Sequence, residues 1–170
     1  MNPQHAIIRT RANSFAIIAT AGLVAGFLDG AAAAIQFYIN TGKNPSIVFK
    51  YISSAIIGKE AFAGGTGMVV LGIFLHLLIA CIFAALFYVA YVRIRWMQKN
   101  VWASGVLYGV IVWTIMNYLI VPMSKIGPPA AFDWQKAMVS MLIIIFCVGL
   151  PIALITAFRM KRVDVGEVAY

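Results

Sequence analysis

Residues 66–92 read TGMVVLGIFLHLLIACIFAALFYVAYV, and His76 is the only acidic or basic side chain among them. A bilayer core about 30 Å thick is crossed by about 20 apolar residues in a helix that rises about 1.5 Å per residue. Three more stretches meet this requirement, at about 14–38, 101–121 and 137–158. The sequence therefore predicts an all-α, polytopic membrane protein whose four transmembrane helices form one domain over residues 1–170.

The composition agrees with a protein that lipid surrounds. Of the 170 residues, 63% are hydrophobic and 11% are charged, and the mean hydropathy is +0.94. A soluble domain carries about 25% charged residues, so the composition excludes a cytosolic enzyme, a disordered chain and a disulfide-rich secreted domain. The net charge of +8 is spread outside the apolar runs. We therefore expect membrane lipids, and no nucleic acid, as the partner of these charges.

A fifth, shorter helix is predicted at about 45–57, between the first two spans. Asn44 suits the N-cap, Pro45 the first helical position and Gly58 the end of the helix. Ile47, Val48, Tyr51, Ile52 and Ala55 share one face, and Lys50, Ser53 and Ser54 share another. Because this helix is too short to span a bilayer, it is either interfacial or re-entrant.

Lysine and arginine counts predict the orientation. Eight of these residues lie near the termini and in the loop after the second span, including all six arginines, and five lie on the other side. The positive-inside rule then places both termini in the cytoplasm. A cleaved signal peptide is the alternative for the first span, since Arg9 and Arg11 precede it and Ala31–Ala34 resembles a cleavage site. The apolar stretch exceeds the about 7–15 residues of a signal peptide, which favours a retained helix.

The loop between the third and fourth spans is predicted to run from Pro122 to about Lys136 outside the membrane. Pro122, Gly127, Pro128 and Pro129 favour turns there. Within the fourth span, Pro151 predicts a bend that deprives the Cys147 carbonyl of its usual donor.

Asp29 and His76 are the candidate functional pair. Asp29 lies about nine residues from the outer end of the first span, and His76 lies about ten residues into the second, so we expect both at one depth. A charged group in the middle of a bilayer costs about 2.5–3.5 kcal/mol on insertion scales and is a functional site by default. The alternative is a buried structural pair that fixes helix register.

Further polar and small residues complete the predicted site. Asn117 and Ser140 lie at a similar outer level, so a cavity there is expected to open outward. Intramembrane Ser and Asn more often serve helix packing, at about 0.6 kcal/mol each. Glycines that allow close helix approach are predicted at Gly22, Gly26, Gly30, Gly72, Gly105 and Gly109.

Metal and cofactor chemistry has little basis in the sequence. The chain has two histidines, His5 and His76, and two cysteines inside predicted spans. One chain therefore cannot hold a bis-histidine haem within the membrane, and no Cys/His cluster has zinc-site spacing. Hydrolase, nucleotide-binding and metalloprotease motifs are missing as well. We expect no cofactor, no metal and no enzymatic activity.

The segments AGLVAGFLDG, IIGKEAFAGGTG, LGIFLHLLIA and GVLYGVIVWTIMNYLIVPMS together resemble a widespread group of small bacterial four-helix inner-membrane proteins. A more distant similarity is to the YagU-type membrane proteins, whose acidic and Trp-rich segments have no counterpart here. The resemblance covers about residues 14–125 and implies a bacterial inner-membrane location. The positions that match are Asp29, Gly64, Gly65, His76, Tyr108, Gly109, Asn117 and Pro122. An acid-tolerance role is implied by the YagU-type similarity alone.

These observations predict a non-enzymatic membrane protein whose Asp29–His76 layer binds or relays protons or a small polar solute. Asp29 is the expected charge carrier, His76 its titrating partner, and Asn117 a hydrogen-bonding residue toward the outer mouth. The alternative is a structural or accessory subunit that docks onto a larger complex through its glycine faces. An enzyme acting on lipid or quinone is a third possibility, and transport would need a homo-oligomer or a partner subunit.

Overall fold

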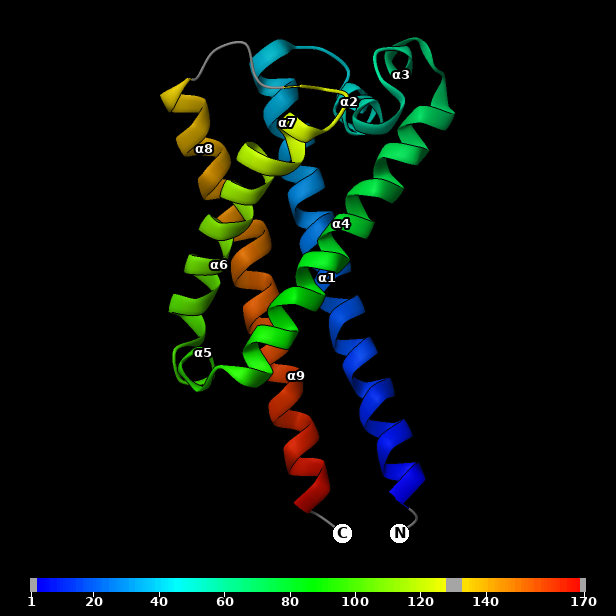
Figure 1. The fold of residues 1–170 in the computed structure, drawn as a ribbon. Helices are drawn as coiled ribbons and strands as arrows, with labels where there is room; N and C mark the ends of the chain where they lie inside the picture. Colours follow the sequence, from blue (N-terminus) through cyan, green and yellow to red (C-terminus); the bar gives the residue numbers. More distant parts are fainter. Residues whose placement is uncertain (1–2, 128–132, 169–170) are drawn as a thin grey trace.

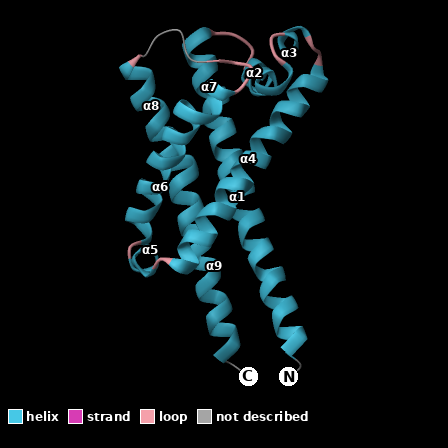
Figure 2. Ribbon diagram, viewed as in Figure 1, coloured by secondary structure: helices cyan, strands magenta, loops and turns pink. Residues whose placement is uncertain are grey.

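The computed structural model describes the backbone of residues 3–127 and 133–168, and within these ranges every regular element is a helix (Figures 1 and 2). The side chains described are those of residues 14–127 and 133–161. The elements in chain order are α1 (Pro3–Thr41), α2 (Ser46–Ile57), α3 (Glu60–Ala63), α4 (Thr66–Arg93), α5 (Arg95–Lys99), α6 (Val101–Ile115), the π-helix η1 (Met116–Ile120), α7 (Val121–Met123), α8 (Trp134–Ile144), the π-helix η2 (Ile145–Gly149) and α9 (Leu150–Val168).

Four helical segments are long and apolar enough to cross a membrane, which confirms the prediction of four spans. They are Ser14–Thr41, Thr66–Arg93, Val101–Met123 and Trp134–Lys161. The first residues of α1 and the last of α9 lie at one end of the bundle, which we call the termini end (Figure 1). The opposite end carries α2, α3 and α7, and we call it the α2 end.

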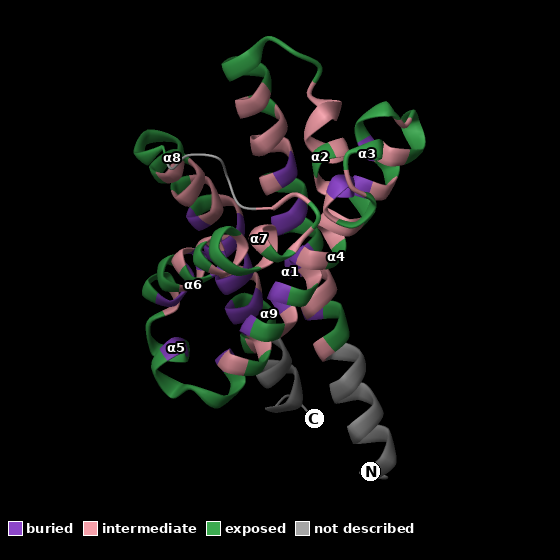
Figure 3. Cartoon of the chain, turned by 45° about the horizontal axis from the view of Figure 1, so that its top comes forward, coloured by how far each residue is buried: buried purple, intermediate pink, exposed green. Residues whose placement is uncertain are grey.

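The spans bury few of their apolar side chains inside the protein. In the most apolar part of each span, between 11% and 33% of the residues are buried, and exposed positions surround the bundle (Figure 3). Phe15, Phe27 and Ile39 of α1 are each more than 70% exposed. Such surfaces suit acyl chains, in which an exposed apolar side chain costs nothing.

Three glycines bring α1 and α4 into backbone contact where the two helices cross. A Cβ added at Gly22 would lie 2.6 Å from the Cα of Cys81, and one at Gly26 would lie 2.9 Å from Leu77. One at Gly30 would lie 3.3 Å from the His76 ring. The three glycines follow one another at intervals of four residues, so they form a single groove along α1 that receives α4.

A second glycine contact joins the third and fourth spans. A Cβ at Gly105 would meet Leu150 at 2.9 Å, and one at Gly109 would meet the Cα of Ile145 at 2.7 Å. Gly149 of η2 lies directly against the backbone of both glycines. The third and fourth spans are thus held together at η2.

The short helix α2 lies across the α2 end of the bundle, in the position the sequence predicts (Figure 1). Its start is marked by Asn44, whose side chain accepts the Ser46 amide at 2.9 Å, and its end by Gly58 at φ +96°.

The helix α2 packs against α4, because Gly72 of α4 lies against the Phe49 backbone of α2. Ser53 is fully buried and donates to the Met68 carbonyl at 2.5 Å. Ser54 is also buried and donates to the Tyr51 carbonyl of its own helix, so both serines of α2 face inward with their hydroxyls bonded.

Each π-helix ends two residues before a proline. The Val121 amide, before Pro122, bonds to the Met116 carbonyl, and the Leu150 amide, before Pro151, bonds to the Ile145 carbonyl. Shifting these bonds from i−4 to i−5 widens the turn and makes room for the proline ring.

The prediction that a loop begins at Pro122 was wrong, since the helix continues through this proline to Met123. Pro128 and Pro129 lie outside the described residues.

The main apolar core lies in the half of the bundle nearer the termini end. Its members come from all four spans and from α5: Ala21, Ala25, Phe83, Ala84, Phe87, Tyr91, Met97, Val112, Val148, Ile152, Ala153 and Ala157. Phe87 is fully buried and makes an edge contact with Tyr108 at 4.9 Å between ring centroids. The Tyr108 hydroxyl donates to the Phe83 carbonyl at 2.6 Å, which links α6 to α4.

The substitution Gly22→Ala is expected to weaken the α1–α4 contact, because the new methyl group would meet the Cys81 backbone, which cannot rotate away. Overpacking of this kind costs about 1–3 kcal/mol, measurable as lower stability to heat or denaturant in detergent micelles. Gly67→Ala is the control, since a Cβ there meets nothing within 4 Å. It should leave stability unchanged or raise it by up to about 1 kcal/mol. Equal stabilities of the two variants would contradict the packing described.

The helix cap at Asp133 predicts a pH response at the start of α8. The Asp133 carboxylate accepts the amides of Gln135 at 3.0 Å and of Lys136 at 3.2 Å. The hydrogen bond from the Lys136 amide is the main cause that holds the pKa of Asp133 below its ordinary value of 3.8. Because folding lowers this pKa, the stabilisation is complete above the ordinary value and is lost as the pH falls through the lowered one.

Amide hydrogen exchange in the first turn of α8, corrected for the intrinsic rate, should therefore accelerate as the pH falls from about 5 to about 2. Asp133→Asn keeps a capping oxygen that does not titrate. It should show no such acceleration, and the same pH response in both proteins would sink the prediction.

Candidate functional site

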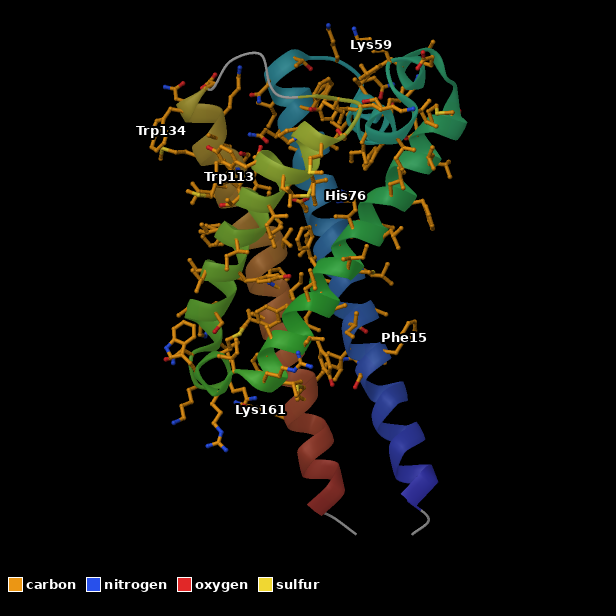
Figure 4. The ribbon with its side chains drawn as sticks, in the orientation of Figure 1. Phe15, Lys59, His76, Trp113, Trp134 and Lys161 are labelled. Atoms are coloured by element: carbon orange, nitrogen blue, oxygen red, sulfur yellow. The ribbon has the colours of Figure 1, made fainter. Side chains whose placement is uncertain are left out.

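Asp29 of α1 and His76 of α4 lie side by side in the middle of the bundle, which we call the Asp29–His76 pair. Their nearest atoms, Asp29 Oδ2 and His76 Nε2, are 3.7 Å apart, and the side chains are 19% and 18% exposed. This distance exceeds that of a hydrogen bond and suits an electrostatic contact. His76 projects near the crossing of α1 and α4 (Figure 4).

The glycine groove of α1 sets the position of the imidazole. His76 Nε2 lies 3.0 Å from the carbonyl oxygen of Gly26. Because a carbonyl only accepts, Nε2 carries the hydrogen in this bond. The ring also lies over Gly30, where a Cβ would come within 3.3 Å of Cδ2 and Nε2. Gly26 thus supplies the acceptor, and Gly30 supplies the space that brings the ring beside Asp29.

On its other side, Asp29 faces the π-helix η2. Its carboxyl group interacts electrostatically with the thiol of Cys147, and α1 packs along η2. The carbonyls of Phe146 and Cys147 lack their regular α-helical donors there. The Leu150 amide bonds to Ile145 instead, and Pro151 has no amide hydrogen. Asp29 is therefore close enough to Cys147 of η2 for an electrostatic interaction, and η2 holds two carbonyls without their regular α-helical donors.

A cavity of about 620 Å³ opens at the α2 end, and we call it the α2-end cavity. It is bounded by α1, α2, α6 with η1 and α7, and the start of α8. Its lining includes Ala33, Gln36, Phe37, Asn40, Tyr51, Trp113, Asn117, Tyr118, Asp133, Lys136 and Ser140. Asn117 and Ser140 are thus placed together here, and neither contacts Asp29 or His76.

The cavity stands directly above Asp29 along one stripe of α1. Ala33, Gln36 and Asn40 follow Asp29 at intervals of four, seven and eleven residues, the spacing of one helix face. Ala33 at the cavity floor is therefore about 6 Å from Asp29 along the helix axis. The core around Phe87 fills the bundle on the other side of the pair. The pair is close to the α2 end and separated from the termini end.

Sequence reasoning found the Asp29–His76 contact but missed most of the cavity wall. Trp113 and Tyr118 were not among the predicted site residues, and in the structure their rings meet edge to face with centroids 6.0 Å apart. Gln36 and Asn40 could have been predicted as site residues, since they are polar and lie on the same face of the helix as Asp29. The contribution of Tyr51 was not, because it depends on how α2 folds over the bundle.

Among the side chains that the structure describes, no group of three or more His, Cys, Asp or Glu could hold a metal ion. No protein-family model, curated protein or solved structure matches the chain. The residues of the site therefore carry the functional argument alone. The resemblance to small bacterial inner-membrane proteins and to the YagU type stays a prediction.

The bond to Gly26 predicts which nitrogen of His76 holds the proton. In a His5→Gln variant, His76 is the only imidazole, so ¹⁵N-histidine spectra report on it alone. At a pH where the ring is neutral, the spectrum should show Nε2 protonated and Nδ1 bare. Gly30→Ala should perturb this signal by crowding the ring. A neutral ring with its proton on Nδ1 would contradict the geometry.

Proposed function

We propose that this protein binds protons or a small polar solute at the Asp29–His76 pair, which is reached through the α2-end cavity. The observation that carries the proposal is the 3.7 Å contact of an acid and an imidazole at mid-span, each still about one-fifth exposed. The proposal includes a bacterial inner-membrane location, which the resemblance implies, and cytoplasmic termini, which the lysine and arginine bias favours.

The energetic cost of the pair supports a functional role. A carboxyl group in the middle of a bilayer is expensive even when it faces a protein interior. A purely structural contact would gain most from a tight hydrogen bond, yet the two groups are too far apart for one. The arrangement suits groups that exchange a proton or a ligand, because neither group is fixed to the other by a hydrogen bond.

The alternative role as an accessory subunit receives less support from the packing. The glycines predicted to receive a partner, among them Gly22, Gly26 and Gly105, are already occupied by helices of the same chain. A partner would have to dock on the larger apolar side chains that face lipid.

Proton flux into liposomes containing the purified protein tests the proposal. An internal pH dye reports uptake driven by a potassium diffusion potential. Asp29→Asn and His76→Gln should each reduce the flux by about tenfold or more, because each removes a titrating group from a place where water cannot replace it.

Glu60→Gln is the matched control, because Glu60 is an exposed acid in α3, outside the spans. Thermal unfolding in micelles should show that all variants remain folded. Undiminished flux in a folded Asp29→Asn variant, or no flux in the unsubstituted protein, would refute proton relay.

A further inference from the structure

We infer that the α2-end cavity binds a monovalent organic cation, such as an amine or quaternary ammonium compound with an apolar body. The inference rests on the proposed function, because it names the class of solute that reaches the Asp29–His76 pair. Three independent properties of the cavity wall carry it: the aromatic rings, the hydrogen-bonding groups left unused, and the distribution of charge.

Four aromatic side chains from four elements line the cavity: Phe37 of α1, Tyr51 of α2, Trp113 of α6 and Tyr118 of η1. Trp113 and Tyr118 are held at 75° to each other. Aromatic faces carry the negative part of the ring quadrupole and attract cations, most strongly when several rings surround the ligand. Burial raises the pKa of Tyr51 above its ordinary 10.0, so its phenol stays neutral.

On the side of the cavity formed by α6, η1 and α8, three polar side chains of the wall use their donors within the protein. The Trp113 indole donates to the Ser140 hydroxyl at 2.9 Å, and that hydroxyl donates to the Ala137 carbonyl at 3.0 Å. The Asn117 amide nitrogen donates to the Trp113 carbonyl at 2.9 Å, which fixes the amide orientation. The Asn117 side-chain oxygen is left to accept. This part of the wall therefore suits a ligand that donates hydrogen bonds or carries positive charge.

The charges around the cavity point to the same ligand. Asp133 and Lys136 are the charged residues of the lining, and they pair at 3.1 Å, so their charges cancel. Asp29 does not line the cavity, but it lies about one helical turn from the lining residue Ala33. Lys50 of α2 donates to the Phe62 carbonyl in α3 and is not part of the lining. Among the described residues of the lining, an anion would thus find no unpaired cation.

The size of the cavity excludes a bare metal ion as its natural occupant. A volume of about 620 Å³ lies within the range of about 300–1,000 Å³ that is typical of sites for small organic molecules. The mixture of rings and a few fixed polar atoms is likewise typical of such sites.

Calorimetric titration of the purified full-length protein in a nonionic micelle tests the inference. The probes are benzyltrimethylammonium, N-benzylacetamide and phenylmethanesulfonate, which share an aromatic body and differ in charge. The cation should bind at least about tenfold more tightly than either of the others. Equal binding of the neutral probe, stronger binding of the anion, or no binding of the cation would overturn the inference.

Paired variants then locate the site. Tyr118 is 64% exposed, so its substitution should not disturb folding. Tyr118→Leu should weaken binding of the cation by about threefold to thirtyfold, whereas Tyr118→Phe, which keeps the ring, should not. Equal effects of the two substitutions would contradict recognition by the ring face.

The two proposals fail in different ways. If Asp29-dependent proton flux is present and the cation does not bind, the cavity inference falls and the proton relay stands. If the cation binds with the Tyr118 pattern and neither flux nor affinity changes in Asp29→Asn, the cavity is a cation site and the connection to the Asp29–His76 pair is refuted.

Discussion

The close approach of α1 and α4 is the constraint on which the site depends. Lipid provides no hydrophobic force between two apolar helices, so their association rests on van der Waals packing and hydrogen bonds. Gly22, Gly26 and Gly30 remove the side chains that would hold the backbones apart. Only at this separation can the His76 ring reach the Gly26 carbonyl and lie beside Asp29. The glycine groove and the Asp29–His76 pair therefore depend on the same contact between α1 and α4.

Proline shapes the opposite side of the site. Pro122 and Pro151 each lie after a widened turn, and these turns face the regions where polar groups gather. η1 carries Asn117 and Tyr118 into the cavity wall, and η2 carries Cys147, whose thiol interacts electrostatically with Asp29. π-turns are frequent at functional sites because they change the direction of side chains without breaking the helix.

Hydropathy and helical periodicity predicted the four spans, the short helix and the shared depth of Asp29 and His76, since each depends on local spacing alone. The continuation of the third span past Pro122 was not predictable, because it depends on a shift of one backbone hydrogen bond. The partner of Gly72 was also missed, since α2 returns over the bundle. The cavity combines residues from four distant segments, and a single sequence does not show how such segments meet.

The two halves of the bundle differ in packing, because the apolar core fills one half and the α2-end cavity opens in the other. Between the pair and the termini end, Phe87 and Ile152 are fully buried, and Ala84 and Ala153 of the same core are fully buried as well. Exposing one large core side chain costs about 1.5–3 kcal/mol, and several would have to separate at once. If a ligand reaches the pair through the α2-end cavity, as proposed, it would have to leave this conformation by the same mouth. Net movement across the bilayer would require a second shape of the molecule, whereas sensing from one side would not.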